Sequence, residues 1–164
     1  MKPVLPLGAI ASTHAPMPAT GLRARWNGAA AKLTRLVPDD LLALASRLSI
    51  AGIFFLSGRT KVEGLLTVTD SAYELFRTEY KLPLVPPELA AHLAAYAEHL
   101  FPLLLVLGLF TRLSALSLLG MTLVIQLFVY PSAWATHLSW AALLLYLAGR
   151  GGGRLALDRL LRIA

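Results

Sequence analysis

The chain contains no cysteine, and only 15% of its 164 residues are charged. The missing cysteine excludes disulfides, thiolate metal sites, iron–sulfur clusters, a c-type haem motif and thiol redox catalysis within this chain. An ordinary soluble domain carries roughly 25% charged residues. The low charge, together with 57% apolar residues, therefore disfavours a soluble globule and excludes disorder over most of the length.

Several functional signatures are also missing. There is no Gly-x-Gly-x-x-Gly, phosphate loop, His-Glu-x-x-His or Gly-x-Ser-x-Gly. Lys and Arg outnumber Asp and Glu by 15 to 9, but they lie mostly outside the long apolar runs rather than among aromatics on one polar face. That distribution indicates a membrane protein and no nucleic-acid partner.

Four apolar runs are long enough to cross a hydrocarbon core of about 30 Å as helices. They are residues 41–57, 89–110, 113–130 and 133–149. The runs are apolar nearly all round, whereas a buried helix of a soluble protein usually keeps one polar face. The sequence therefore predicts an all-α protein, a four-helix transmembrane bundle in a membrane domain over residues 39–149.

The distribution of basic residues predicts the orientation of the bundle. Ten lie on the side of the two termini: Lys2, Arg23, Arg25, Lys32, Arg35, Arg112, Arg150, Arg154, Arg159 and Arg162. Four lie on the opposite side, in the loop of residues 58–88: Arg59, Lys61, Arg77 and Lys81. Because basic residues accumulate in the cytoplasm, both termini are expected there.

The segments flanking the membrane domain are basic. Residues 1–38 form a cytoplasmic segment in which Pro6 and Gly8 interrupt a short apolar patch, so a cleaved signal peptide is not expected. Residues 21–37 are either a solvated tail or a basic surface helix with Trp26, Leu33 and Leu36 toward lipid. The tail, residues 150–164, begins with Gly151-Gly152-Gly153, which predicts a flexible exit from the fourth run.

The loop of residues 58–88 is expected to contain a short helix on the outer membrane surface. Ser71 and Glu74 form a capping-box pattern, and Tyr73, Phe76 and Tyr80 follow at helical spacing. The proline-rich stretch 82–87 then resists helix formation and leads in extended form to the second run.

Two charged residues lie within the predicted spans. Burying a charge there costs roughly 2.5–3.5 kcal/mol on insertion scales, so Arg47 and Glu98 each need a partner. Counted from the ends of their helices, they fall at similar depth. The sequence therefore predicts an Arg47–Glu98 ion pair, which either fixes the register of the bundle or takes part in proton movement or ligand binding.

A second polar layer is predicted nearer the outer face, where His92, Gln126 and His137 come from three helices with Tyr130 and Trp134 above them. These groups either bond between helices as packing contacts or hold a quinone head group whose tail stays in lipid. His99 shares a helix face with His92 about 10 Å away, too far for one small metal ion, and no metal or haem is expected. The candidate quinone-binding residues are His92, His99, Gln126, Tyr130, Trp134 and His137.

The order of several short motifs resembles the DoxX family of small four-helix membrane proteins, over about residues 43–162. The motifs are Arg47, the segment 55–61 with Gly58 and Lys61, Glu98, the turn 108–112 ending in Arg112, the segment 121–131, Trp134, His137 and Trp140. The last segments are similar to a subgroup that accompanies peptide-modifying iron enzymes and metal-stress systems. The resemblance implies a multi-pass protein of the bacterial cytoplasmic (inner) membrane and a link to quinone.

Three functions follow as hypotheses. The first is the membrane subunit of a quinone-linked oxidoreductase complex, whose protein partner supplies the electron-storing groups. The second is a non-enzymatic scaffold or assembly partner that anchors soluble redox or metal-stress proteins. The third is a small transporter or export helper, which would need a homo-oligomer because four helices leave little room for a path.

Overall fold

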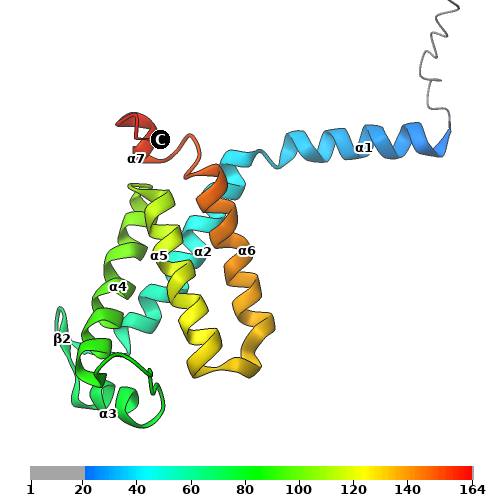
Figure 1. Ribbon diagram of the computed structural model, residues 1–164. Coiled ribbons are helices and arrows are strands. Elements are labelled where there is room, and N and C mark those ends of the chain that lie inside the picture. The colour runs from blue at the N-terminus through cyan, green and yellow to red at the C-terminus, as the bar shows by residue number, and fades with distance from the viewer. Residues whose placement is uncertain (1–20, 164) are drawn as a thin grey trace, which may run out of the picture. The chain divides into compact units, whose positions relative to one another are not determined.

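The computed structural model describes residues 21–163, and the chain divides into two compact units after Leu36. Its elements are α1 (Leu22–Leu36), α2 (Asp39–Arg59), β1 (Val62–Glu63), β2 (Thr67–Val68), α3 (Asp70–Thr78), α4 (Pro87–Leu107), α5 (Thr111–Val124), the π-helix η1 (Ile125–Val129), the 3₁₀ helix η2 (Pro131–Ala133), α6 (Trp134–Arg150) and α7 (Leu157–Leu160). We call the end of the second unit that carries α7 the inner end, and the end that carries α3 the outer end (Figure 1).

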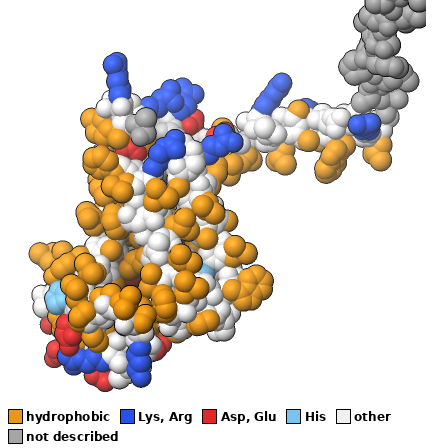
Figure 2. All heavy atoms as spheres, viewed as in Figure 1, with side chains coloured by type: hydrophobic (Ala, Val, Ile, Leu, Met, Phe, Trp, Pro, Cys, Tyr) orange, Lys and Arg blue, Asp and Glu red, His pale blue; other side chains and the backbone are white. Residues whose placement is uncertain are grey.

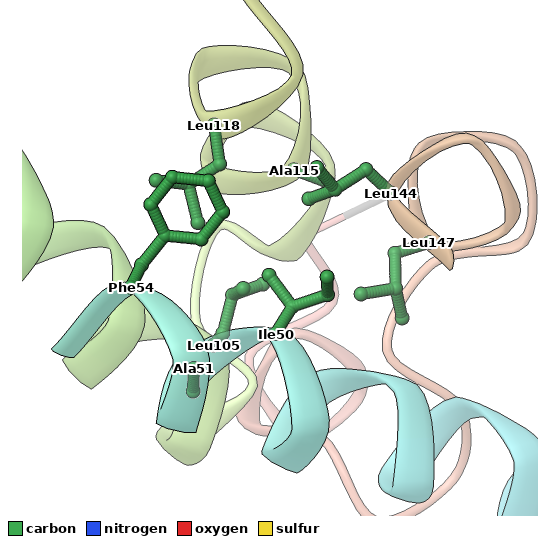
Figure 3. Packing of buried hydrophobic residues seen from close by; sticks show 8 residues of the cluster. All are labelled: Ile50, Ala51, Phe54, Leu105, Ala115, Leu118, Leu144 and Leu147. Atoms are coloured by element: carbon green, nitrogen blue, oxygen red, sulfur yellow. The ribbon is translucent and has the colours of Figure 1, made fainter. Parts of the chain in front are cut away.

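Helices α2, α4, α5 and α6 pack side by side in a ring (Figure 1). In this ring α2 contacts α4 and α6, while α5 contacts α4 and α6. The centre is filled by apolar side chains from all four helices, shown in Figure 3: Ile50, Ala51, Phe54, Leu105, Ala115, Leu118, Leu144 and Leu147. The four predicted apolar runs thus form helices whose ends lie within about three residues of the expected ones.

Three helical segments are long and apolar enough to cross a membrane: Asp39–Arg59, Pro87–Leu107 and Thr111–Val129, the last made of α5 and η1. Helix α6 is also apolar and is shorter, at 17 residues. Leu56, Leu103, Leu116 and Leu145 are more than half exposed on the outside of the ring. Figure 2 shows this apolar flank between two ends that carry the charges. An apolar exterior of this kind suits contact with lipid rather than water.

A β-hairpin and α3 cover the outer end of α4. In the hairpin, Val62 pairs with Val68 in antiparallel register. Val62, Val68 and the α3 residues Ala72 and Phe76 pack on Ala90, Ala91 and Ala95 of α4. The short helix predicted in this loop is therefore confirmed, whereas the hairpin was not anticipated from the sequence.

The capping box predicted at Ser71 is wrong by two residues. The N-cap of α3 is Thr69, whose side-chain oxygen accepts a hydrogen bond from the backbone N–H of Ala72 at 3.2 Å. Ser71 already lies in the first turn and bonds to the Thr69 hydroxyl. The helix therefore begins as soon as the hairpin ends.

The prediction that the three glycines form a flexible exit from α6 is also wrong. Gly152 is buried, and a Cβ on it would lie 2.6 Å from the Ala156 Cβ and 2.7 Å from the Thr111 Oγ1. A side chain does not fit at that distance. Glycine is therefore needed because the backbone packs directly against α5, and the tail folds back over the inner end of the bundle (Figure 1).

Before the bundle, the structure selects the helical alternative for residues 21–37, because Leu22–Leu36 form the single helix α1. The signal-peptide question concerns residues that lie outside the described range of 21–163.

Candidate functional site

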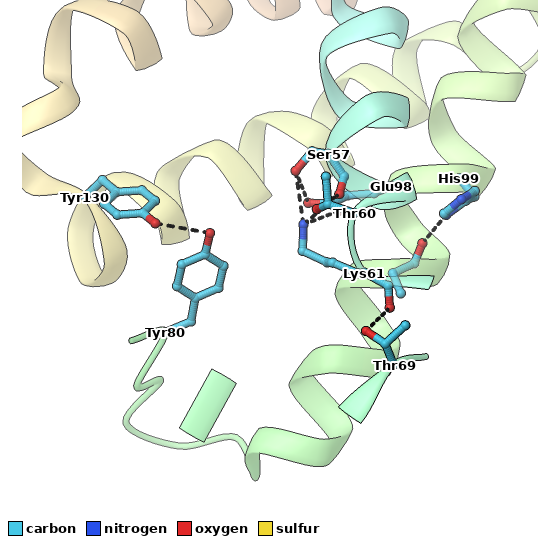
Figure 4. Close-up of polar contacts among 9 residues, drawn as sticks. Ser57, Thr60, Lys61, Thr69, Tyr80, Glu98, His99 and Tyr130 are labelled. Atoms are coloured by element: carbon cyan, nitrogen blue, oxygen red, sulfur yellow. Dashed lines mark hydrogen bonds and ion pairs between the residues drawn. The ribbon is translucent and has the colours of Figure 1, made fainter. Parts of the chain in front are cut away.

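A buried ion pair joins Lys61 and Glu98 in the outer half of the bundle. The Lys61 Nζ lies 2.7 Å from the Glu98 Oε2, and their side chains are only 5% and 4% exposed. Ser57 completes the cluster, because its hydroxyl donates to the Glu98 Oε1 at 3.3 Å while its Oγ and carbonyl oxygen accept from the Lys61 Nζ (Figure 4). Each charge is thus compensated within the protein.

The end of α2 positions this cluster. Ser57 lies in the last turn of α2, and Lys61 follows four residues later, where the backbone N–H of Lys61 still bonds to the Gly58 carbonyl. The backbone N–H of Thr69 donates to the Lys61 carbonyl at 3.1 Å, which ties the residue to the hairpin. Lys61 is therefore held from both sides and directed into the bundle.

Gly58 brings α2 and α4 close together at this level. A Cβ on Gly58 would lie 2.9 Å from the Glu98 Cβ and 2.9 Å from the His99 ring. Such a contact is shorter than side chains tolerate. The absence of a side chain at Gly58 thus allows Glu98 to approach Ser57 and Lys61.

His99 lies beside the ion pair and keeps one free nitrogen. Its Nδ1 bonds to the Ala95 carbonyl at 2.6 Å, and because a carbonyl only accepts, Nδ1 carries the proton in the neutral ring. The Nε2 is buried and has no hydrogen-bond partner in the described part of the chain. The ring packs edge-on against Phe55.

Two cavities meet at the ion pair. The larger, of about 260 Å³, is enclosed mainly by apolar side chains of α4, α5, η1 and the segment before α4, such as Leu93, Met121 and Val129. The smaller, of about 110 Å³, lies toward α2 and α6. Lys61 and Glu98 line both cavities. The larger cavity is thus apolar, with a donor, Lys61, and an acceptor, Glu98, paired at one end.

Gln126 and His137 form a second polar contact, between η1 and α6. The Gln126 amide nitrogen donates to the Pro131 carbonyl at 2.8 Å, so its oxygen is the acceptor for His137 Nδ1 at 2.7 Å. Both residues and the exposed Trp134 line a groove of about 330 Å³ between α5 and α6. His137 also faces the smaller cavity beside the ion pair. The π-helical turn, a feature common at functional sites, carries Gln126.

The structure divides the predicted polar layer, because His92 does not join Gln126 and His137. His92 Nε2 bonds to the Tyr73 hydroxyl at 3.1 Å, and Nδ1 bonds to the Glu88 carbonyl at 2.8 Å. Its side of α4 faces α3 instead of the bundle centre. The expected layer of three helices is therefore wrong for His92.

Tyr130 closes the outer side of the smaller cavity. Its hydroxyl donates to Glu79 and lies 3.3 Å from the Tyr80 hydroxyl, within hydrogen-bond distance, and Tyr80 lines both cavities (Figure 4). The hydrogen bond to Glu79 raises the pKa of Tyr130 well above its ordinary value. The phenol therefore stays protonated at any physiological pH.

The predicted Arg47–Glu98 ion pair is wrong. Arg47 is 1% exposed, and its guanidinium donates to four carbonyl groups at the inner end. These are Leu105 at 2.6 Å, Val106 at 2.6 Å, Gly152 at 3.0 Å and Leu155 at 3.4 Å. Arg47 thus caps the carboxyl end of α4 and binds the tail.

The register of α2 and α4 explains the error. The depth count assumed that both helices end at the same level, but Gly58, next to the last residue of α2, lies beside Glu98. Helix α4 therefore continues for about ten residues beyond α2 and packs there against α3 and the hairpin. Arg47 is left level with Leu105.

The turn between α4 and α5 is also a structural contact site. Asp158 accepts the backbone N–H groups of Phe110 at 2.6 Å and Thr111 at 2.8 Å, which caps the start of α5. Arg112 Nη1 donates to the Ala148 and Gly149 carbonyls at the end of α6. Arg112 therefore fixes the inner end of the bundle and lies far along the helices from the ion pair.

Sequence reasoning missed Ser57 and Lys61 as the partners of Glu98, although Lys61 was singled out in a loop motif. The sequence did contain a signal for this cluster. Ser57 and Lys61 are four residues apart at the end of a helix, which places both on one face. Within residues 21–163, no group of three His, Cys, Asp or Glu side chains is placed to hold a metal ion.

Comparison with known proteins identifies the sequence relationships of the chain. Residues 42–131 match the DoxX family model. An uncharacterised protein of Haemophilus influenzae is 30% identical over 132 residues, which cover 73% of this chain and 82% of the relative. No solved structure matches the chain.

Proposed function

Because this chain belongs to the DoxX family of membrane proteins, we propose that it is a multi-pass protein of the bacterial cytoplasmic membrane that binds a quinone. In this proposal it serves as the membrane subunit of a quinone-linked oxidoreductase complex. The observation that carries the proposal is the Lys61–Glu98 pair at the end of an apolar cavity of about 260 Å³.

The topology in this proposal has four spans and both termini in the cytoplasm. Helix α6 spans together with the three longer segments, since its 17 residues give a length of about 25 Å. One of the four basic residues of the outer loop, Lys61, is buried against Glu98. The basic groups exposed at the outer end are therefore fewer than the sequence suggests, which supports the assignment of the inner end to the cytoplasm.

The donor set of the cavity fits a quinone. Ligand pockets are mainly apolar with a few placed polar groups. Here the Lys61 ammonium and the Glu98 carboxylate line both cavities, and the Ser57 hydroxyl lines the smaller one. A quinone ring has two carbonyl acceptors and otherwise an apolar body. A bound quinone would supply two-electron, two-proton redox chemistry.

Each residue of the cluster then has a distinct task. In this structure the three Lys61 N–H groups donate to Glu98 and to the two oxygens of Ser57, so a quinone carbonyl would take over one of the two donors now bound to Ser57, while Glu98 would hold or receive a proton beside it. The side chains of Leu93, Met121 and Val129 exclude water from the ring and leave the tail in lipid. Electrons come from a partner protein or a bound cofactor, because without cysteine the chain has no thiol pair or iron–sulfur cluster of its own to store them.

The test is extraction of quinone from the protein purified in mild detergent. We expect the wild-type chain to retain quinone, and Lys61→Met and Glu98→Gln to retain much less. Ala94→Phe, which places a bulky side chain in the cavity and leaves Lys61 and Glu98 unsubstituted, should also displace it. His92→Ala is the matched control, because His92 lines neither cavity.

Two outcomes would overturn the proposal. One is a wild-type protein that carries lipid but no quinone. The other is equal retention by the wild type and by Ala94→Phe at equal yield and equal melting temperature.

A further inference from the structure

Helix α1 carries an apolar face that no described residue of its own unit covers. Leu22, Trp26, Leu33 and Leu36 recur at intervals of four, seven and three residues, which return to one side of an α-helix. Their exposed fractions are 85%, 71%, 62% and 74%. No residue of α1 is buried. Such a face is unstable in water and calls for an apolar surface.

Basic residues border this face. Arg25 and Lys32 lie along one edge, and Arg23 and Arg35 lie farther round the helix. No Asp or Glu occurs between Met1 and Pro38. Along α1, Figure 2 shows orange apolar side chains on one side and blue Lys and Arg on the other. The helix therefore combines apolar area with a positive charge that nothing local neutralises.

The chain itself restricts where α1 can be. Only Val37 and Pro38 separate it from α2, which begins at Asp39 and is the first candidate membrane span. Two extended residues reach at most about 7 Å. Wherever α2 enters the bilayer, the end of α1 thus remains close to the lipid headgroups.

We propose that α1 lies in the plane of the cytoplasmic membrane surface, with Leu22, Trp26, Leu33 and Leu36 among the acyl chains and its basic residues on acidic phospholipid headgroups. One orientation of the helix satisfies both interactions, since the long basic side chains extend from the edge of the apolar face back to the headgroups. The ligand is an anionic lipid surface. Helix α1 recognises it by the negative charge of the headgroups and by the apolar acyl chains beneath them.

A second copy of the chain is a poorer occupant of this face. Packing two α1 helices face to face would gather the basic residues of both copies around one interface, and α1 has no Asp or Glu to pair with them. Like charges at the rim of an interface repel. The headgroups of an anionic bilayer carry negative charges, which attract the same basic residues.

Trp26 provides a direct probe in the full chain. Replacing Trp134 and Trp140 with Phe leaves Trp26 as the single tryptophan. The protein is reconstituted in vesicles of phosphatidylcholine alone or with phosphatidylglycerol. We expect blue-shifted Trp26 emission and quenching by brominated acyl chains when phosphatidylglycerol is present, both weakened by salt.

The charge contribution is tested with Arg25→Gln and Lys32→Gln in this single-tryptophan chain. We expect the ratio of lipid-bound to free α1 to fall about fivefold for each charge removed. Unchanged quenching in the double variant would overturn the electrostatic part of the proposal.

The orientation of the helix is tested with single cysteines, because the native chain has none. Ala29→Cys lies on the apolar face and Ala31→Cys on the opposite one, so the two variants are matched controls. A spin label at position 29 should be reached by oxygen dissolved in lipid, and one at position 31 by a water-soluble nickel chelate. Equal accessibility to the chelate at both positions, or disulfide cross-linking between copies through position 29 whatever the lipid, would overturn the proposal.

Discussion

The buried charges of this bundle are arranged as two separate groups. Glu98 belongs with Lys61 and Ser57 near the outer end, while Arg47 is bound by backbone carbonyls at the inner end. Sequence reasoning correctly required a partner for each charge, because an unpaired charge in a membrane is costly. It assigned the wrong partners, since the sequence does not show how far α4 extends beyond α2.

Double-mutant cycles test this arrangement. We expect a coupling of about 1–3 kcal/mol between Lys61→Met and Glu98→Gln, measured as unfolding free energy in detergent with increasing dodecyl sulfate. For Arg47→Met and Glu98→Gln, the effects should add within about 0.5 kcal/mol because the two side chains share no partner. Strong coupling in the second cycle would show that Arg47 and Glu98 interact directly, in contradiction to this arrangement.

A spectroscopic prediction concerns Tyr130. Because the hydrogen bond to Glu79 raises the pKa of Tyr130, its phenol should remain protonated as pH rises above about 10, where an ordinary tyrosine ionises. A raised folded-state pKa contributes stability below the ordinary value, and this contribution is lost at higher pH. In an absorbance titration of phenolate, Glu79→Gln should return one tyrosine to the lower range, whereas Glu74→Gln should not.

At the scale of elements, hydropathy located the four helices well because a long run of apolar residues without alternation satisfies its backbone in lipid by forming a helix. The sequence could not reveal the two-residue strands, which depend on the pairing of Val62 with Val68. Nor could it reveal η1, since a π-helical turn is defined by a hydrogen bond such as that from the Tyr130 N–H to the Ile125 carbonyl. The contact of Gln126 with His137 was anticipated from depth alone and depends on that turn.

The close approach of α2 and α4 gives a prediction with an internal control. Gly58→Ala should lower the unfolding free energy by about 1–3 kcal/mol, since its Cβ would lie 2.9 Å from the Glu98 Cβ. Gly52, in the same helix, has nothing within 4 Å of an added Cβ. Gly52→Ala should therefore be neutral or stabilise the helix by up to about 1 kcal/mol. The same loss in both variants would show that the two helices are not packed through Gly58.

At the scale of the whole molecule, the distribution of charge predicts on which side of the membrane each end of the bundle lies. Single cysteines at Ser71, in α3, and at Leu160, in α7, report on opposite ends of the bundle. In intact cells, we expect a membrane-impermeant maleimide to label Ser71→Cys. Leu160→Cys should be labelled only after the cells are opened. The reverse pattern would invert the topology.

The contacts of Arg47 also set an order of events during synthesis. Two of its four acceptors, Gly152 and Leu155, follow Arg47 in the chain by 105 and 108 residues and lie after α6. Until that segment leaves the ribosome, the Arg47 guanidinium in α2 lacks half of its acceptors. The bundle can therefore close around Arg47 only after Gly152 and Leu155 have been synthesised, and a product truncated before them would remain loose enough for membrane proteases to remove it.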